Sequence, residues 1–513
     1  MGRGRLGTLS CQIATAALLW CALPGQPPSA LAETEPQRVN LQEPAPYWPE
    51  TRRLVSALLE ETPLIEDLRS LTDEIGGRPT GSEANLRSVE WALDRFRTMG
   101  VEVRKEAFSM PAQWLENRAE ARISGAATFR PRIAAMPFSI ATPEAGLQAP
   151  LVDGGFGTDA DFQSLGETAK GAFVIIETHE LEDIDGLFRE YEDAAAIERR
   201  AFAAGVTGVV YSGSRHRNVL YRHNAALGHN NQHPLVVMER EEALRTLRLL
   251  RTGQELELWI HLDLETGESY ESYNVIGEIK GSQKPEEIIV LGAHLDSWGL
   301  GTGALDNGCN VVLLLDIARQ IRQLGILPKR TIRFALWNGE EQIFYGSWGY
   351  TKTHQEELDR TIMASSFDIG SGRITGFYTN GRPELAAALD RALEPVAGLG
   401  PFEHPPDPVV GTDNFDFMMQ GVANVVANQE AANYGSNYHA STDTFDKVDQ
   451  RQLRLNSAIA GAFAWGFANM DVTWNRQNRA EIQHLIDTTD LGKQLRTFDR
   501  WQEWVEKKRG RLD

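Results

Sequence analysis

Cysteine is almost absent from this chain of 513 residues, which contains only three. Cys11 and Cys21 lie near the N-terminus, so Cys309 is the one cysteine in the rest of the sequence. The chain after the N-terminal segment therefore cannot form an internal disulfide. We expect Cys309 to be a small buried residue at a helix start rather than a nucleophile.

Positive charge is also in short supply. The 51 Lys and Arg residues face 71 Asp and Glu residues, which gives a formal net charge of −20. A nucleic-acid partner is therefore not expected, because proteins that bind nucleic acid normally carry a cluster of basic residues on their surface. The composition, 42% hydrophobic and 24% charged, is typical of a globular protein. The length is enough for two or three domains.

No apolar run is long enough for a permanent transmembrane helix. The apolar run Ile13–Leu23 follows Arg3 and Arg5. Ala30-Leu31-Ala32 then has the small-x-small form that a signal peptidase prefers. We interpret residues 1–32 as a secretory signal. The protein is expected to be exported, either to a periplasm or to the medium, with no stable membrane span.

Four further segments differ in their sequence pattern. Residues 33–120 are predicted to be the N-terminal part of a catalytic domain and 121–271 an inserted β-rich domain. In 272–474 strands alternate with helices, which predicts an α/β fold with a mostly parallel central sheet flanked by helices. Residues 475–513 are polar and helix-prone, and they are expected to pack as a C-terminal extension or in a homodimer interface.

Chemically active side chains recur at the ends of successive predicted strands. The ligand site of an open α/β sheet lies outside the carboxyl ends of its strands, so these residues can converge. Two imidazoles with several carboxylates form a ligand set suited to zinc, for which manganese or cobalt can substitute. The residues are His294, Asp296, Asp306, Glu340, Glu341, Asp368 and His439.

Each of these residues alone is more often structural than functional, and only their joint occurrence at strand ends argues for a site. A histidine cluster competes with them as a metal site. It lacks paired carboxylates and lies in a polar, turn-rich stretch, so we interpret it as a solvated loop of the inserted domain. Its members are His216, His223, His229 and His233.

These residues resemble the M28 family of zinc aminopeptidases and carboxypeptidases. Ala293–Ser297, Gly303–Asn307 and Glu340-Glu341 are similar to three of its motifs, in the family's order. Phe367–Gly370 and Tyr438-His439 are similar to its last two ligand segments. A further N-terminal match includes Gly76, Arg78 and Thr80–Glu83. His294–Trp298 looks closest to the carboxypeptidase Q branch, and segment 121–271 is similar to a protease-associated insertion.

The resemblance implies two zinc ions bridged by Asp306, with His294 and Asp368 on one and Glu341 and His439 on the other. Glu340 would be the general base that takes a proton from water and passes it to the leaving amine. Asp296 would orient His294. The family also suggests a cis peptide after Asp306.

Several functions stay open at this point. The leading hypothesis is a dipeptidase or carboxypeptidase that acts on short peptides. The first alternative is an aminopeptidase that acts on longer peptides. A non-catalytic binding protein and a glutaminyl cyclase on a related fold are the others. The substrate-binding residues are unknown, although Gly411–Phe415 is a plausible pocket loop or a simple turn.

Overall fold

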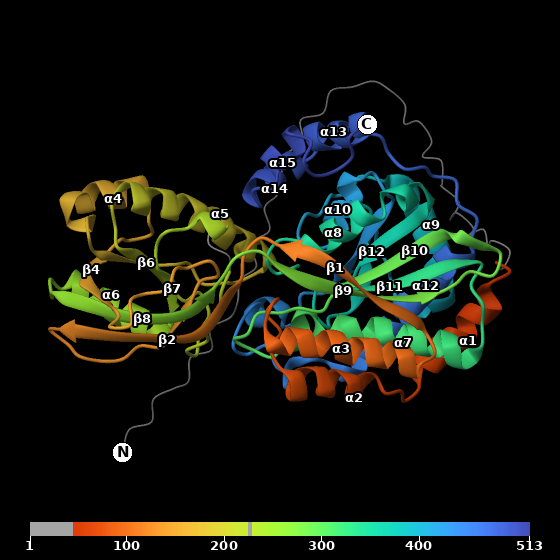
Figure 1. The fold of residues 1–513 in the computed structure, drawn as a ribbon, viewed down its shortest axis with the longest axis horizontal. Helices are drawn as coiled ribbons and strands as arrows, with labels where there is room; N and C mark the ends of the chain where they lie inside the picture. The colour runs from red at the N-terminus through yellow and green to blue at the C-terminus, as the bar shows by residue number, and fades with distance from the viewer. Residues whose placement is uncertain (1–44, 224–227) are drawn as a thin grey trace, which may run out of the picture. The chain divides into compact units, whose positions relative to one another are not determined.

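The computed structural model describes residues 45–223 and 228–513, and Figure 1 shows their fold. The predicted signal segment 1–32 lies outside the described residues. None of the helices in the described ranges is long and apolar enough to cross a membrane.

A mixed seven-stranded sheet forms the centre of the larger α/β part, in the order β1-β9-β11-β10-β12-β14-β13. Its four inner strands β11, β10, β12 and β14 are parallel, whereas β1, β9 and β13 pair antiparallel at the edges. The prediction of a mostly parallel sheet therefore holds for the four inner strands and not for the three outer ones. The strands are β1 Glu102–Met110, β9 Tyr270–Ile279, β10 Lys284–His294, β11 Arg330–Trp337, β12 Thr361–Ser366, β13 Ile374–Tyr378 and β14 Asn424–Gln429.

Helices cover both faces of this sheet because its inner strands are apolar on both sides. In β10, Ile289 and Leu291 join the core beneath α7 and α12, while Ile288 and Val290 face the helices α8 and α10. The helices of this part are α1 Trp48–Leu59, α2 Leu64–Arg69, α3 Glu83–Thr98, α7 Cys309–Leu324, α8 Tyr345–Thr353, α9 Ala386–Leu393, α10 Asn414–Met419, α11 Tyr434–Asn437 and α12 Gln450–Asn469. Cys309 is fully buried at the start of α7, as predicted.

A second seven-stranded sheet, with its own core, is built from the residues between β1 and β9. Its order is β2-β8-β4-β5-β6-β7-β3, and Figure 1 shows it beside the first sheet. The strands are β2 Trp114–Gly125, β3 Ile133–Ala135, β4 Leu147–Asp153, β5 Phe173–Ile176, β6 Gly208–Ser212, β7 Leu235–Met238 and β8 Leu256–Thr266. The helices are α4 Asp159–Leu165, α5 Ile184–Ala203 and α6 Arg240–Arg251. We call this part the inserted unit. Its relation to protease-associated domains stays a prediction, and so do the domain boundaries.

The residues after α12 form a compact helical extension on the α/β part. Its helices are α13 Arg479–Thr488, α14 Leu491–Thr497 and α15 Trp501–Val505, so the predicted helical character is confirmed. Apolar residues of the extension pack against α10 and against Phe344, which follows the Glu340-Glu341 pair. The Arg509 guanidinium donates to both carboxylate oxygens of Asp416 at 2.8 and 2.7 Å, and both side chains are only 2% exposed.

We predict that Arg509→Met destabilises the fold by about 3–5 kcal/mol, because it leaves the Asp416 carboxylate buried without its partner. Lys508→Met is the matched control, since Lys508 is 69% exposed and pairs with Glu506 on the surface; it should change the stability by less than about 1 kcal/mol. Denaturant unfolding measures both. Equal stability of the two variants would contradict the assignment of Arg509 as the anchor of the extension.

Candidate metal centre

The carboxyl ends of the inner strands bring the predicted site residues together. The strand order reverses at β10, whose neighbours β11 and β12 follow it in sequence on opposite sides, and such a switch point is where α/β sheets place ligands. Each of these residues is at most 8% exposed. His294 ends β10, Asp306 lies in the turn before α7, Glu340 and Glu341 follow β11, Asp368 follows β12, and His439 lies beyond α11.

The carboxylate of Asp306 lies between the two imidazoles. Its Oδ1 is 3.1 Å from Nε2 of His294, and its Oδ2 is 3.4 Å from Nε2 of His439. His294 Nε2 also lies 2.9 Å from Asp368 Oδ1, and His439 Nε2 lies 2.8 Å from Glu341 Oε2. The cluster thus consists of two half-sites, each with one imidazole and one carboxylate of its own, which share Asp306.

Glu340 occupies a different place from Glu341, although the two are adjacent in sequence. Its Oε2 lies 4.0 Å from His294 Nε2, on the side of the Asp368 half-site, whereas Glu341 contacts His439. The two neighbours therefore present their carboxylates to different members of the cluster.

Hydrogen bonds hold the turn that carries Asp306. The Asp443 carboxylate accepts from the backbone N–H groups of Ala304, Leu305 and Asp306 at 3.0, 2.6 and 3.1 Å. Arg78, which is fully buried, donates to four backbone carbonyls around the same turn, among them that of Gly303 at 2.9 Å. The peptide bond after Asp306 is cis, as the resemblance suggests.

Asp296 lies on the far side of the His294 ring. His294 Nδ1 is 3.0 Å from the backbone oxygen of Asp296 and 3.6 Å from its carboxylate, so Nε2 is turned toward the cluster. The carboxylate of Asp296 accepts from the Thr80 hydroxyl at 2.7 Å and from the Gly339 N–H at 3.0 Å. Thr80 thereby links the loop after β11 to the loop after β10. In the sequence, only its place in the N-terminal motif suggested that Thr80 belongs to the site.

Burial and mutual repulsion perturb the carboxylates of the cluster. Burial raises the pKa of Glu340 well above its usual range and raises the pKa of Glu341 to about 6. Burial alone would lower the pKa of His294, but Asp368 and Glu340 outweigh it and raise that pKa. Carboxylates packed this closely favour a bound cation, because positive charge between them removes their repulsion.

The inserted unit contacts the cluster through residues 220–222. The backbone N–H of Arg222 donates to the oxygen of His439 at 3.2 Å, and the oxygen of Arg222 lies 3.0 Å from His439 Nδ1. Tyr221 and Ala440 form an antiparallel bridge beside them. The Arg222 carbonyl thus fixes the ring so that Nε2 faces the cluster, and nothing in the sequence pattern pointed to this residue.

The four histidines of the competing cluster do not form a metal site. His216 pairs with Glu180 at the surface, His229 packs on Phe138, and His233 stacks on Phe202. His223 is buried at 5% exposure, with its ring 4.9 Å from that of Tyr191, so the prediction that it is solvated was wrong. Aromatic neighbours from α5 and from β6 cover it, and a loop pattern in the sequence does not show them.

A pocket of about 740 Å³ opens beside the cluster. Asp368, Tyr434 and Tyr438 border it at the cluster end, and Gly411 and Thr412 of the predicted pocket loop are part of its wall. Residues from α5 and α14 form the opposite walls. A cavity of this size suits a small organic ligand.

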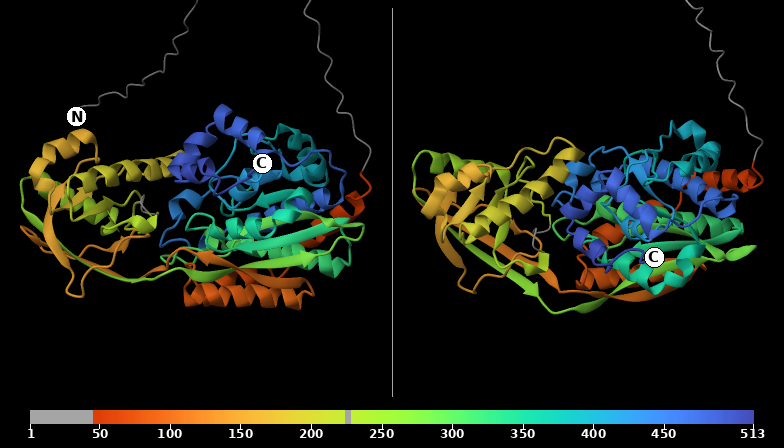
Figure 2. Two further views of the ribbon diagram at one scale, coloured as in Figure 1. Left: turned by 45° about the horizontal axis from the view of Figure 1, so that its top comes forward. Right: turned by 90° about the horizontal axis from the view of Figure 1, so that it is seen from above.

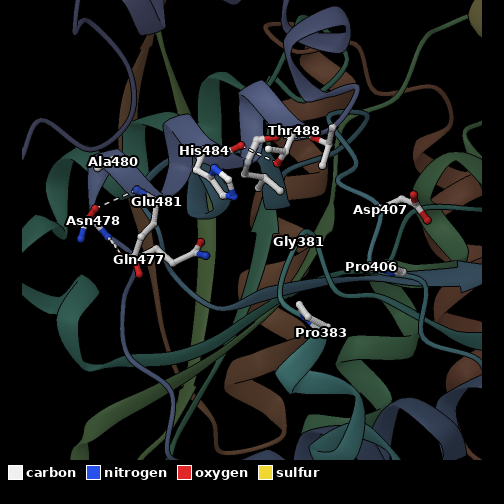
Figure 3. Close-up of a pocket in the computed structure, with 12 residues that line it drawn as sticks. Gly381, Pro383, Pro406, Asp407, Gln477, Asn478, Ala480, Glu481, His484 and Thr488 are labelled. Atoms are coloured by element: carbon white, nitrogen blue, oxygen red, sulfur yellow. Dashed lines mark hydrogen bonds between the residues drawn. The ribbon is translucent and has the colours of Figure 1, made fainter.

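Figure 3 shows another pocket, of about 650 Å³, lined by α13 and by Gly381, Pro383, Pro406 and Asp407. His484 and Thr488 face it from α13. No residue of the cluster borders this pocket, so it has no part in the chemistry described below.

The donor set fits a metal. Ligand atoms of His294, Asp306 and Glu341 lie within 4.8 Å of one another, and all three side chains are buried. Imidazole nitrogens combined with carboxylate oxygens suit zinc and related divalent cations.

Comparison with known proteins defines the class of the protein, a metallo-exopeptidase. Residues 274–464 match the model of Peptidase family M28.

Relatives and solved structures agree with this match. Carboxypeptidase Q of Xenopus laevis is 24% identical over 413 residues, which cover 79% of this chain and 86% of the relative. A peptidase M28 precursor from Shewanella amazonensis superposes with a TM-score of 0.76 at 28% identity and covers 84% of this chain and 98% of its own. BSAP, a zinc aminopeptidase from Bacillus subtilis, has the same fold, with a TM-score of 0.63 at 22% identity over 80% of this chain and 96% of its own.

We predict that loosening the Arg222 segment weakens metal binding. Arg222 is buried, and its guanidinium lies 3.3 Å from Glu116, so Arg222→Met removes the ion pair that anchors the segment. The affinity for zinc should fall about 10-fold or more, as it does when the partner of a ligating imidazole is disturbed. Isothermal titration of zinc into the metal-stripped protein measures the change.

Arg217→Met is the control, because Arg217 is exposed in the same unit; it should bind zinc as tightly as the unaltered protein. If Arg222→Met keeps both its fold and its zinc affinity, the inserted unit does not position His439.

Proposed function

We propose that the protein is an exported di-zinc exopeptidase that hydrolyses dipeptides or other short peptides. One observation carries the proposal: the Asp306 carboxylate presents one oxygen to each imidazole, so two similar half-sites share it. A single metal would leave one of these half-sites without a cation. The proposed ligands are His294 and Asp368 on one side, Glu341 and His439 on the other, and Asp306 between them.

Bound zinc would supply Lewis acidity, which polarises the scissile carbonyl and lowers the pKa of nearby water toward about 7. The residues of the chain then handle the proton. Glu340 is buried beside the cluster, and burial raises the pKa of its carboxyl group well above the usual range, which makes the carboxylate a stronger base. In this scheme it takes a proton from water and returns it to the amine that leaves. Asp296 holds the His294 ring through its backbone oxygen.

The substrate is proposed to lie in the 740 Å³ pocket beside Asp368. The names of the relatives support an exopeptidase of either polarity, since one is a carboxypeptidase and another an aminopeptidase. We favour a carboxypeptidase or dipeptidase. The alternative is an aminopeptidase, and the peptide experiment below distinguishes the two. We further propose that the inserted unit is related to protease-associated domains. We also propose that the domains of the chain begin and end where the sequence predicts, with the inserted domain at 121–271.

We predict that Glu340→Gln keeps its zinc and lowers kcat by about 10²–10⁴-fold, because the amide cannot accept the proton. Glu341→Gln is the contrasting variant, since it removes a proposed ligand and should lower the zinc content. Elemental analysis and steady-state kinetics are measured on both. A Glu340→Gln enzyme with undiminished turnover would exclude Glu340 as the general base.

The function itself is tested with four peptides and the zinc-loaded enzyme: a free dipeptide, its N-acetylated form, its C-amidated form and a pentapeptide. We expect cleavage of the free dipeptide that a chelator abolishes and that added zinc restores. Release of successive N-terminal residues from the pentapeptide would establish the aminopeptidase instead. Failure to cleave any of the four with zinc bound would favour a non-catalytic binding protein.

A further inference from the structure

The outer walls of the pocket come from two elements that lie outside the family match at 274–464. Helix α14 of the C-terminal extension contributes Lys493, Gln494 and Thr497, followed by Phe498. Helix α5 of the inserted unit contributes Tyr191 and Glu192. Figure 2 shows α14 lying beside α5, although about 300 residues separate them in sequence.

The α14 wall is held firmly in place. The Gln494 amide donates to the oxygen of Pro408 at 2.9 Å and accepts from the N–H of Val410 at 3.0 Å, so it clamps the loop on which Thr412 lies. Leu491 and Leu495 are fully buried on the opposite face of the helix. The wall therefore cannot withdraw from a bound ligand without breaking this packing.

The α5 wall meets the cluster side through one aromatic side chain. The Tyr191 hydroxyl lies 3.2 Å from that of Tyr438, the neighbour of His439, and its ring lies 6.3 Å from that of Phe498. Tyr191 thus contacts both the cluster end and the α14 end of the pocket. Because these contacts hold the ring of Tyr191 in place, it forms a rigid wall of the pocket.

An ion pair links the two helices next to the pocket. Nζ of Lys493 lies 2.8 Å from Oε1 of Glu192, and the two side chains are 69% and 38% exposed. Both residues line the pocket, so a ligand that extends past α14 must displace or pass this pair.

We propose that α14 and α5 close the outer end of the substrate pocket and thereby limit the substrate to peptides of two or three residues. This inference rests on the proposed function. The pocket volume of about 740 Å³ lies in the range that encloses small organic ligands, to which a di- or tripeptide belongs. A pentapeptide, about 17 Å long when extended, would project beyond the Lys493–Glu192 pair.

The first experiment is a charge-reversal cycle on that pair. Lys493→Glu, Glu192→Lys and the double variant are compared by the ratio of kcat/KM for a dipeptide to that for a pentapeptide of the same terminal residues. Each single reversal sets like charges against one another and should lower the ratio by about two- to fivefold, the effect of an exposed ion pair. The double variant should restore the ratio. Lys508→Glu makes the same charge change in the extension, away from the pocket, and should leave the ratio as it was.

The second experiment narrows the pocket from α14. Thr497→Trp should raise KM for a dipeptide with a bulky side chain by about 10-fold, because the indole takes the space the substrate needs. Thr488→Trp makes the same change at an exposed position of α13 that does not line this pocket, and it should leave that KM as it was. The melting temperature of each variant shows that the fold is intact.

The outcomes separate this inference from the proposed function. If the dipeptide is cleaved in a chelator-sensitive way but the length preference is absent, or the charge reversals and Thr497→Trp change nothing, the enclosed pocket is wrong and the exopeptidase stands. If no peptide is cleaved, the proposed function fails first. A length preference that the single reversals weaken and the double variant restores supports the inference.

Discussion

The shared carboxylate of Asp306 is the contact on which the rest of the site depends. One oxygen faces each imidazole, so the turn before α7 must hold this side chain within reach of both the end of β10 and the segment after α11. The buried Asp443 carboxylate and the buried Arg78 guanidinium hold that turn through its backbone. Because these supports are themselves buried ionic groups, a change in either would propagate to both half-sites.

The chemistry and the substrate pocket come from different parts of the chain. All members of the cluster lie within 274–464, the stretch that matches the family. The inserted unit supplies the carbonyl that orients His439, and it forms one side of the pocket through Tyr191. The extension forms another side and is anchored by the Arg509–Asp416 pair. Selection among peptides can therefore change through α5 and α14 while the cluster stays the same.

Sequence reasoning reached the strand ends well and the tertiary contacts poorly. Apolar runs such as Ile288–Ala293 predict strands, and polar residues that follow them must gather at one sheet edge, which is how the structure arranges His294 and Asp368. The antiparallel edge strands were missed because pairing direction leaves no mark in such short runs. Arg222 acts through its backbone carbonyl, which any residue possesses, so no side-chain pattern could identify it. The burial of His223 likewise depends on Tyr191, 32 residues away.

The number of zinc ions bound per chain tests the shared role of Asp306 most directly. Elemental analysis of the zinc-loaded protein after exhaustive dialysis should give about two zinc ions per chain. Asp306→Asn should bind at most one, because both half-sites lose their common ligand, whereas Asp407→Asn, which borders the pocket outside the cluster, should still bind two. One zinc ion in the unaltered protein, or two in Asp306→Asn, would contradict the account.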